Sequence, residues 1–168
     1  MSTLPPIGLR WAVKRSFLDY VSRAPGGKGT IGAGATVTSL NEIVFEPDPS
    51  DLPMPPAEGT FRAFRGRVTF SAHFGMLVVR IADPWVTIDG DLGDLTVLDP
   101  WQQTEGSARL RLASFEIDDH RITDGLEHWT AAIVRLASEG CALFNDVYEA
   151  GVLLEPLTII LPTRSASD

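Results

Sequence analysis

Alternation of apolar and polar residues with period two recurs along this chain and constrains its fold more than any other feature. Between Arg65 and Ala72, the apolar side chains of Val68, Phe70 and Ala72 alternate with polar ones, and Ser107–Phe115 repeats the pattern. Because successive side chains of a β-strand point to opposite faces, this spacing predicts strands with one buried and one wet face. Further short strands are expected at 28–40, 43–45, 76–82, 85–89, 95–98, 129–136 and 157–161.

Two other segments have helical spacing. The first, 8–23, brings five apolar or aromatic side chains to one stripe, namely Leu9, Val13, Phe17, Tyr20 and Val21. The second, 139–150, has a stripe of Cys141, Phe144, Val147 and Tyr148, with Ser138 as its expected N-cap and Gly151 as its stop. The sequence therefore predicts two α-helices, near 8–23 and 139–150.

These elements predict a mainly β fold, either an antiparallel β-sandwich or an open barrel of about nine to eleven short strands with two α-helices. The helices do not alternate with the strands, so a parallel βαβ arrangement is disfavoured. We expect a single domain over 1–168, with its core at about 8–161 and a polar C-terminal tail at 162–168. Five prolines between Phe45 and Gly59 exclude helix and central strand, and we interpret that stretch as an excursion over the surface.

The charge of the chain narrows the range of its partners. The net charge is −8 and is unevenly distributed: residues 1–80 carry nine basic and six acidic side chains, whereas residues 81–168 carry five basic and sixteen acidic ones. Nucleic acids and anionic membranes attract clustered Lys and Arg, so we expect neither as a partner. A small anionic ligand is favoured near the first half.

Targeting and catalytic motifs are not found in the sequence. The single cysteine, Cys141, has no second cysteine for a disulfide or a thiolate metal site. The first residues lack the apolar run of a signal peptide, so we expect the protein to be cytoplasmic as the sequence stands, and extracellular if a leader was removed. Nucleophile-elbow, phosphate-loop and zinc-protease motifs are missing, so the sequence does not point to an enzyme.

Three weaker patterns are interpreted as structural. The glycines of 27–36 lie in a strand-like segment, which argues against a nucleotide site between strand and helix. His120 and His128 lie among acidic residues and are expected in a solvated loop. The turn Asp89–Asp94 departs from the spacing of a calcium loop and is expected to be an acidic hairpin turn. Taken alone, Tyr20 is interpreted as a core tyrosine with its hydroxyl at the rim.

Four motifs, in this order, resemble one known family. They are WAVKRSFLDYV at 11–21, a glycine-rich strand after it, FSAHFG at 70–75, and SEGCALFNDVYEAG at 138–151 followed by LEPL. The set spans 8–161 and resembles the HtaA-type haem-binding domain of bacterial haem-uptake proteins. The fold that this resemblance implies, two antiparallel sheets with two helices, agrees with the pattern of strands and helices above.

The resemblance implies a ligand set for ferric haem b. Tyr20 matches the family's helix tyrosine, whose phenolate coordinates the haem iron, and His73 matches the strand-end histidine that hydrogen-bonds this phenolate. Tyr148 is matched to a second aromatic residue of the family's site. Ferric iron favours a hard anionic oxygen, and a tyrosine, which titrates near ~10 when free, needs the iron's charge and a hydrogen-bond donor to ligate as phenolate at neutral pH.

Further contacts with the cofactor are expected around this pair. The rings of Phe17 and Phe74 are expected to stack on the macrocycle. The backbone is expected to approach it closely at Gly32, Gly34 and Gly75, and Ser16 is expected beside it. Candidates to meet the propionates are Arg10, Lys14, Arg15, Arg23 and Lys28.

The expected function is that of a haem carrier, chaperone or store rather than an enzyme. Its expected partners are haem and a haem donor or acceptor protein, and its expected state is a monomer or a haem-mediated dimer. Two alternatives remain open. One is a lipocalin-like module for another apolar small molecule, in which Tyr20 and His73 are ordinary polar groups of the pocket, and the other is a structural interaction domain that has lost haem binding. An absorbance band in the Soret region after addition of hemin separates these readings.

Overall fold

The structure, a computed structural model, describes residues 7–48, 60–100 and 108–163 of the chain. Within these ranges the chain forms fifteen β-strands, one α-helix and two short 3-10 helices, and every pair of neighbouring strands is antiparallel. The predicted mainly β, antiparallel class is confirmed. Most of the proline-rich stretch, Ser107 and the end of the polar tail lie outside the described residues.

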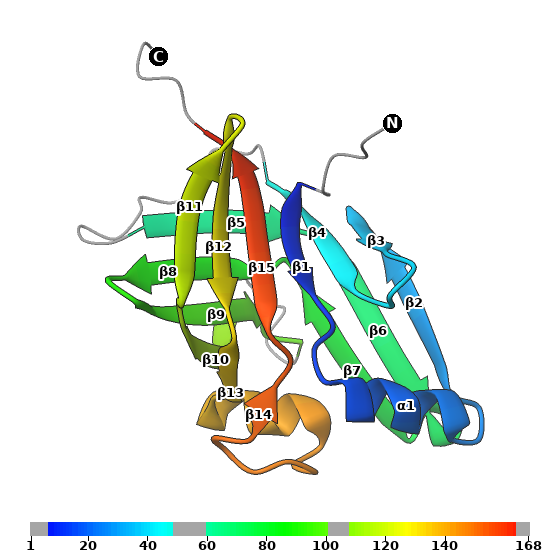
Figure 1. The fold of residues 1–168 in the computed structure, drawn as a ribbon. Coiled ribbons are helices and arrows are strands. Elements are labelled where there is room, and N and C mark those ends of the chain that lie inside the picture. Colours follow the sequence, from blue (N-terminus) through cyan, green and yellow to red (C-terminus); the bar gives the residue numbers. More distant parts are fainter. Residues whose placement is uncertain (1–6, 49–59, 101–107, 164–168) are drawn as a thin grey trace.

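Twelve of the strands form one curled sheet with the shape of a half-barrel (Figure 1). Its order is β11-β12-β15-β1-β4-β5-β8-β9-β10-β13-β14, with β3 paired to β4. The strands are β1 (Gly8–Trp11), β3 (Ala35–Val37), β4 (Ile43–Pro47), β5 (Thr60–Arg65), β8 (Trp85–Asp89), β9 (Leu92–Leu98), β10 (Arg109–Glu116), β11 (Asp119–Thr123), β12 (Leu126–Ala131), β13 (Ile133–Leu136), β14 (Leu153–Leu154) and β15 (Leu157–Pro162).

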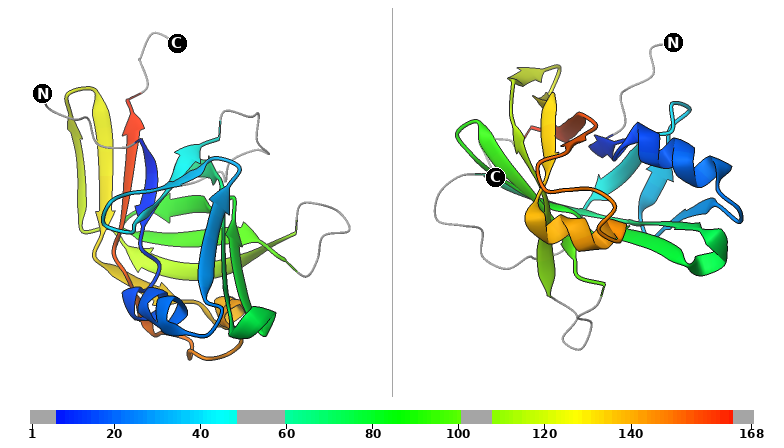
Figure 2. Two further views of the ribbon diagram at one scale, coloured as in Figure 1. Left: turned by 90° about the vertical axis from the view of Figure 1, so that its right-hand side faces the viewer. Right: turned by 90° about the horizontal axis from the view of Figure 1, so that it is seen from below.

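The remaining three strands form a small sheet in the order β2-β6-β7, made of β2 (Lys28–Gly32), β6 (Arg67–Ala72) and β7 (Leu77–Ala82). The helix α1 (Arg15–Arg23) and the 3-10 helix η2 (Ser138–Phe144) lie at the same end of the molecule, as the view from below in Figure 2 shows. The second 3-10 helix, η1 (His73–Gly75), joins β6 to β7 at this end.

One continuous apolar core fills the space between the two sheets and α1. It follows the predicted alternation: in β6, Val68, Phe70 and Ala72 are buried, whereas Thr69 and Ser71 are only partly covered. The largest fully buried side chains are Trp11, Phe45, Phe64 and Phe144. Among the described residues, no helix has the length and apolar character needed to cross a membrane.

The predicted helix over 8–23 is wrong in its first half. Gly8–Trp11 is strand β1, paired with β15 on one side and β4 on the other, and α1 begins only at Arg15. Leu9, Trp11 and Val13 are all fully buried, so the segment also fits period two, and a central position in the sheet satisfies its backbone on both edges. Val13, with φ of 62°, separates the strand from the helix.

The helix predicted over 139–150 is present but is shorter and of a different type. The chain instead forms η2, which ends where Asn145 and Asp146 adopt left-handed φ values of 55° and 56°. Its N-cap is Ala137 rather than Ser138, and no side chain caps it. Asn and Asp tolerate the left-handed region better than most residues, which allows the chain to turn after Phe144.

The number of strands exceeds the nine to eleven expected. The segment 28–40 is two strands, because Ala33 and Gly34 turn with positive φ between β2 and β3, and 129–136 contains the end of β12 and all of β13. His120 and His128, expected in a loop, lie on the hairpin β11–β12. Strand β9 starts at Leu92, so the predicted turn Asp89–Asp94 is shorter than expected.

Candidate functional site

Tyr20 and His73, 53 positions apart in the sequence, meet at the end of the molecule that carries the helices. The phenol oxygen Oη of Tyr20 lies 2.5 Å from Nε2 of the His73 imidazole. Tyr20 belongs to the last turn of α1, whereas His73 is the first residue of η1. The Tyr20 side chain remains 49% exposed, so its oxygen is accessible to a ligand from outside the protein.

The pairing of β2 with β6 explains why these two side chains meet. Lys28 lies opposite Ser71 in this antiparallel ladder, so the residues before Lys28 and those after Ser71 approach each other beyond its end. The backbone N–H of His73 donates to the carbonyl oxygen of Pro25 at 2.7 Å. His73 and Phe74 then adopt left-handed φ values of 53° and 56°, which turn the chain sharply between β6 and β7.

An open pocket of ≈ 670 Å³ lies against this pair. Apolar and aromatic side chains make up most of its wall, and the polar groups are few. It is lined by Ser16, Phe17, Tyr20, His73, Met76, Leu77, Phe144, Asn145, Val147 and Tyr148. Three of the side chains predicted at the site, Ser16, Phe17 and Tyr148, are thus brought to Tyr20 and His73.

The inner wall of the pocket is part of the protein core. Phe17 is only 3% exposed, and its ring makes edge-to-face contacts with Phe70, Phe144 and Tyr148 at centroid distances of 5.4, 5.3 and 6.4 Å. Such edge-to-face pairs add to the stabilisation that burial alone provides. The wall is therefore rigid and forms together with the fold.

Tyr148 contributes a second phenol to the pocket. Burial raises the pKa of Tyr148 above its ordinary value, nearby Tyr20 raises it further, and a hydrogen bond with Ser16 lowers it. The ammonium group of Lys14 lies 5.4 Å from the centre of the Tyr148 ring and donates to the carbonyl oxygen of Leu153 at 3.2 Å. Tyr148 is therefore a neutral hydrogen-bonding phenol at neutral pH.

A smaller and more polar hollow of ≈ 400 Å³ reaches the Tyr20–His73 pair from its other side. It is lined by Ser16, Asp19, Tyr20, Arg23, Ala24, Pro25 and His73. Arg23, one of the basic residues predicted for an anionic ligand, thus lines the same hollow as the phenol. Two of the other candidates have partners elsewhere: Arg10 pairs with Glu42, and Arg15 donates to the carbonyl oxygen of Leu40.

Several other predicted residues do not line the pocket. Gly34 lies against Glu46 and Arg65, Gly32 belongs to β2, and Gly75 has open space around it. Phe74 is 85% exposed, and its ring packs over Gly26. These positions, predicted to approach the macrocycle, are not brought to the pocket with Tyr20 and His73.

Five lining residues, Met76, Leu77, Phe144, Asn145 and Val147, were not predicted at the site. The first two follow the FSAHFG motif directly and belong to the segment expected as a strand at 76–82. Phe144 ends η2, and the last two lie in the turn after it, where the helical interpretation put Phe144 and Val147 on one apolar stripe. The structure leaves Val147 67% exposed on the pocket rim.

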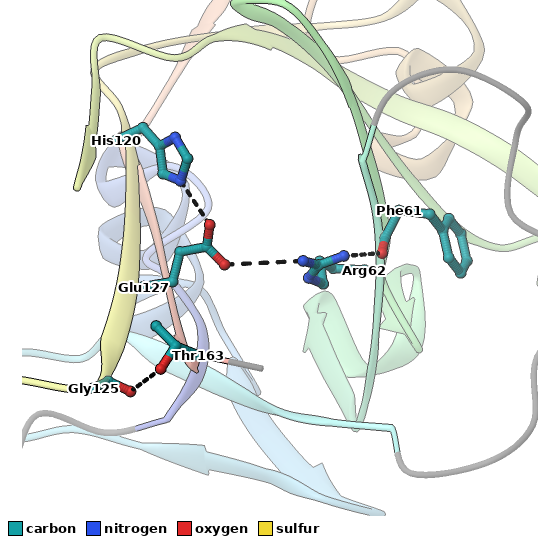
Figure 3. A network of polar contacts seen from close by, with 6 residues as sticks. All are labelled: Phe61, Arg62, His120, Gly125, Glu127 and Thr163. Atoms are coloured by element: carbon teal, nitrogen blue, oxygen red, sulfur yellow. Dashed lines mark hydrogen bonds and ion pairs between the residues drawn. The ribbon is translucent and has the colours of Figure 1, made fainter. Parts of the chain in front are cut away.

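A separate polar cluster lies at the hairpin β11–β12. His120 Nε2 lies 2.8 Å from a Glu127 carboxylate oxygen, and Arg62 on β5 points toward the same carboxylate (Figure 3). The His120 ring stacks on Trp129 with centroids 4.9 Å apart. Within the described ranges, no group of three or more His, Cys, Asp or Glu side chains is arranged to hold a metal ion.

Comparisons with known proteins identify the family and support the fold. The model of the HtaA family, described as Htaa, matches residues 7–160. Among curated proteins, none matches the chain at a significant level. The solved structures that the chain resembles include three from Corynebacterium glutamicum, and these likenesses concern the fold.

The N-terminal domain of HtaA is 19% identical, with a TM-score of 0.70 over 92% of this chain and 96% of that one. The C-terminal domain of HtaA is 21% identical, with a TM-score of 0.68 over 90% of this chain and 94% of that one. HtaB, which is called a heme binding protein, is 19% identical, with a TM-score of 0.66 over 93% and 92%. Since the family model covers nearly all of the sequence, the chain belongs to the HtaA family.

Proposed function

We propose that this protein binds ferric haem b in the ≈ 670 Å³ pocket, with the Tyr20 phenolate as axial ligand and His73 as its hydrogen-bond donor. The observation that carries the proposal is the distance of 2.5 Å between Tyr20 Oη and His73 Nε2. At this distance, an imidazole N–H can donate a hydrogen bond to the phenolate oxygen that would hold the iron.

The residues of the pocket fit a flat, apolar cofactor with charged edges. The pocket lies within the usual range of about 300–1,000 Å³ for cofactor sites and combines a mainly apolar wall with few polar groups. Tyrosinate oxygen is one of the recognised protein ligands of haem iron. When bound, the ferric centre would supply the positive charge that stabilises the Tyr20 phenolate.

Charged and polar groups around the pair have separate roles in this proposal. Arg23 and Lys14 lie near Tyr20 and Tyr148 and supply positive charge for the carboxylates of haem. Tyr148, held neutral, donates a hydrogen bond inside the pocket, and Ser16 orients it. Phe17 provides the flat apolar wall.

The open geometry favours a carrier, chaperone or store over an enzyme. Tyr20 is half exposed, and the rim residues Met76 and Val147 are 84% and 67% exposed. Such apolar side chains at the mouth of a binding site give a haem donor or acceptor protein a surface to contact. The same rim is also the surface at which two copies of the chain would meet in a haem-mediated dimer. The oligomeric state with and without haem tests this part of the proposal.

The experiment that tests the proposal is a titration with hemin, followed in the Soret region, of the wild type, Tyr20→Ala and Tyr148→Phe. We expect Tyr20→Ala to lose the wild-type spectrum, because the anionic ligand is removed, while its fold is kept. Tyr148→Phe is the matched control: it removes the other phenol of the same pocket and keeps the ligand. Size-exclusion chromatography with and without hemin reports the dimer.

Two outcomes would contradict the proposal. If Tyr20→Ala keeps the wild-type spectrum, Tyr20 is not the ligand. If wild-type protein gives no Soret band with hemin but binds an apolar fluorescent probe in a manner that Phe17→Ala abolishes, the pocket belongs to another apolar ligand. Absence of both signals would identify an interaction domain without a small ligand.

A further inference from the structure

The two segments that carry Tyr20 and His73 are joined by a short backbone path. The N–H of Ala24, which ends α1, donates to the carbonyl oxygen of Tyr20 at 3.0 Å. One residue later, the carbonyl oxygen of Pro25 accepts the N–H of His73 at 2.7 Å. Only Ala24 and Pro25 therefore separate the phenol-bearing turn from the imidazole-bearing corner.

Gly26 brings the two segments into close contact. It has a φ of 68°, and a Cβ atom added to it would lie 2.9 Å from Cδ1 and 3.1 Å from Cε1 of the Phe74 ring. Real Cβ atoms essentially never approach another heavy atom that closely, so a larger residue at this position has to displace Phe74. The ring of Phe74 thus rests on the bare backbone of Gly26 although most of it faces solvent.

We propose that Pro25, Gly26 and Phe74 form a clasp that positions His73 against Tyr20 before any ligand binds. His73 and Phe74 are consecutive non-glycine residues with left-handed φ values, a conformation that persists only where the surroundings fix it. The Pro25 carbonyl fixes the first of them and the Gly26 surface fixes the second. Pro25, Gly26 and Phe74 are therefore positioning residues, because they hold His73 and do not contact the ligand themselves. The role given to His73 rests on the proposed function.

The exposed hydrogen bond between Tyr20 and His73 is weak unless the backbone of one partner is held in place. Among the described contacts, the only hydrogen bond of the His73 ring is the one with Tyr20, and the Tyr20 side chain is itself half exposed. An exposed hydrogen bond between two mobile side chains is weak, because water competes for both groups. Fixing the backbone of one partner removes much of the entropy that the pair would lose on meeting.

The test uses ligand-free protein and nuclear magnetic resonance. The readouts are the ¹⁵N shifts and the pH titration of the His73 ring, one of only three histidines in the chain, and the exchange rate of the His73 amide. Gly26→Ala should shift the ring signals and increase amide exchange about tenfold, as expected for loss of one backbone hydrogen bond.

The matched control is Gly90→Ala. Gly90 has nearly the same φ, 65°, in the turn between β8 and β9, but no atom lies within 4 Å of an added Cβ. It therefore carries the same backbone strain without the contact. Its His73 signals should equal those of the wild type. The double variant Gly26→Ala/Phe74→Ala removes both contact surfaces of the clasp, so its His73 amide should exchange at least as fast as in Gly26→Ala.

The proposal is overturned if Gly26→Ala leaves the His73 signals as they are in Gly90→Ala, or if the double variant returns the His73 signals to those of the wild type. Should Gly26→Ala fail to fold, Phe74→Ala alone decides: faster exchange of the His73 amide supports the clasp, and unchanged exchange refutes it. None of these readouts involves haem, so a failed hemin titration leaves them valid, and a failed clasp leaves the hemin result valid.

Discussion

Truncation of Phe17 to alanine tests whether the pocket wall is also part of the core. The Phe17 side chain is 3% exposed and meets three aromatic rings edge to face. Buried Phe→Ala changes cost about 3–5 kcal/mol. Phe17 borders an open pocket, so water can enter the vacated space, and we expect the lower end, about 3 kcal/mol. For a domain of this size, that corresponds to a decrease in Tm of about 6–12 °C.

The matched control is the same chemical change at Phe74, which is 85% exposed. An exposed substitution usually alters global stability by less than about 0.5 kcal/mol. Urea unfolding of both ligand-free variants, followed by tryptophan fluorescence, measures the two losses, and the buried Trp11 and Trp129 provide the signal. If Phe17→Ala costs less than about 1 kcal/mol, or if Phe74→Ala costs as much, the assignment of Phe17 to the core is refuted.

Four further predictions concern the site. His73→Ala should weaken hemin binding by about 10- to 100-fold without abolishing it, since it removes a partner of the ligand and not the ligand; an unchanged spectrum and affinity would exclude His73 from the site. Ultraviolet titration of the ligand-free protein, which has two tyrosines, should show Tyr148 ionising above the ordinary tyrosine pKa. Tyr20→Phe should lower the pKa of Tyr148, because the charge of the nearby Tyr20 phenolate is one of the causes that raise it. The raised pKa of Tyr148 makes the folded state more stable below about pH 10, and this contribution is lost as the pH rises through the raised value. Tyr148→Phe should therefore flatten the alkaline part of a plot of unfolding free energy against pH. The same alkaline decrease in variant and wild type would contradict this. Haem transfer to apomyoglobin should accelerate as the pH falls from about 8 to 5, because a phenolate released from iron takes up a proton; a flat profile argues against phenolate ligation.

The strands could be predicted from the sequence where one of their faces is buried. In β6 and β10, apolar side chains alternate with polar ones, and both strands were located to within two residues at each end of the described part. Strand β2 is different because all of its residues except Gly32 are exposed, so burial does not impose a pattern on it. Its end at Gly32 was therefore missed, and 28–40 was interpreted as one strand.

The helices were harder to predict because the same residues fit two periods. Leu9, Val13 and Phe17 are spaced for a helix, but Leu9, Trp11 and Val13 are spaced for a strand. The sequence alone does not reveal that β15 and β4 flank the first residues and satisfy their backbone groups, which decides in favour of the strand. In 139–150, two consecutive left-handed residues end the helix, and Asn-Asp at 145–146 was the available signal.

The Tyr20–His73 pair was found only through resemblance, because nothing in a spacing of 53 residues connects a helix end with a strand corner. The connection is the register of β2 on β6. Continuing that ladder two steps beyond Lys28 and Ser71 places Gly26 opposite His73, next to the end of α1. The burial of Val68, Phe70 and Ala72 fixes which face of β6 is turned to the core where the strand ends before His73. The alternation of β6 orients the strand that leads to the imidazole, and the ladder of β2 on β6 brings this strand end to the phenol.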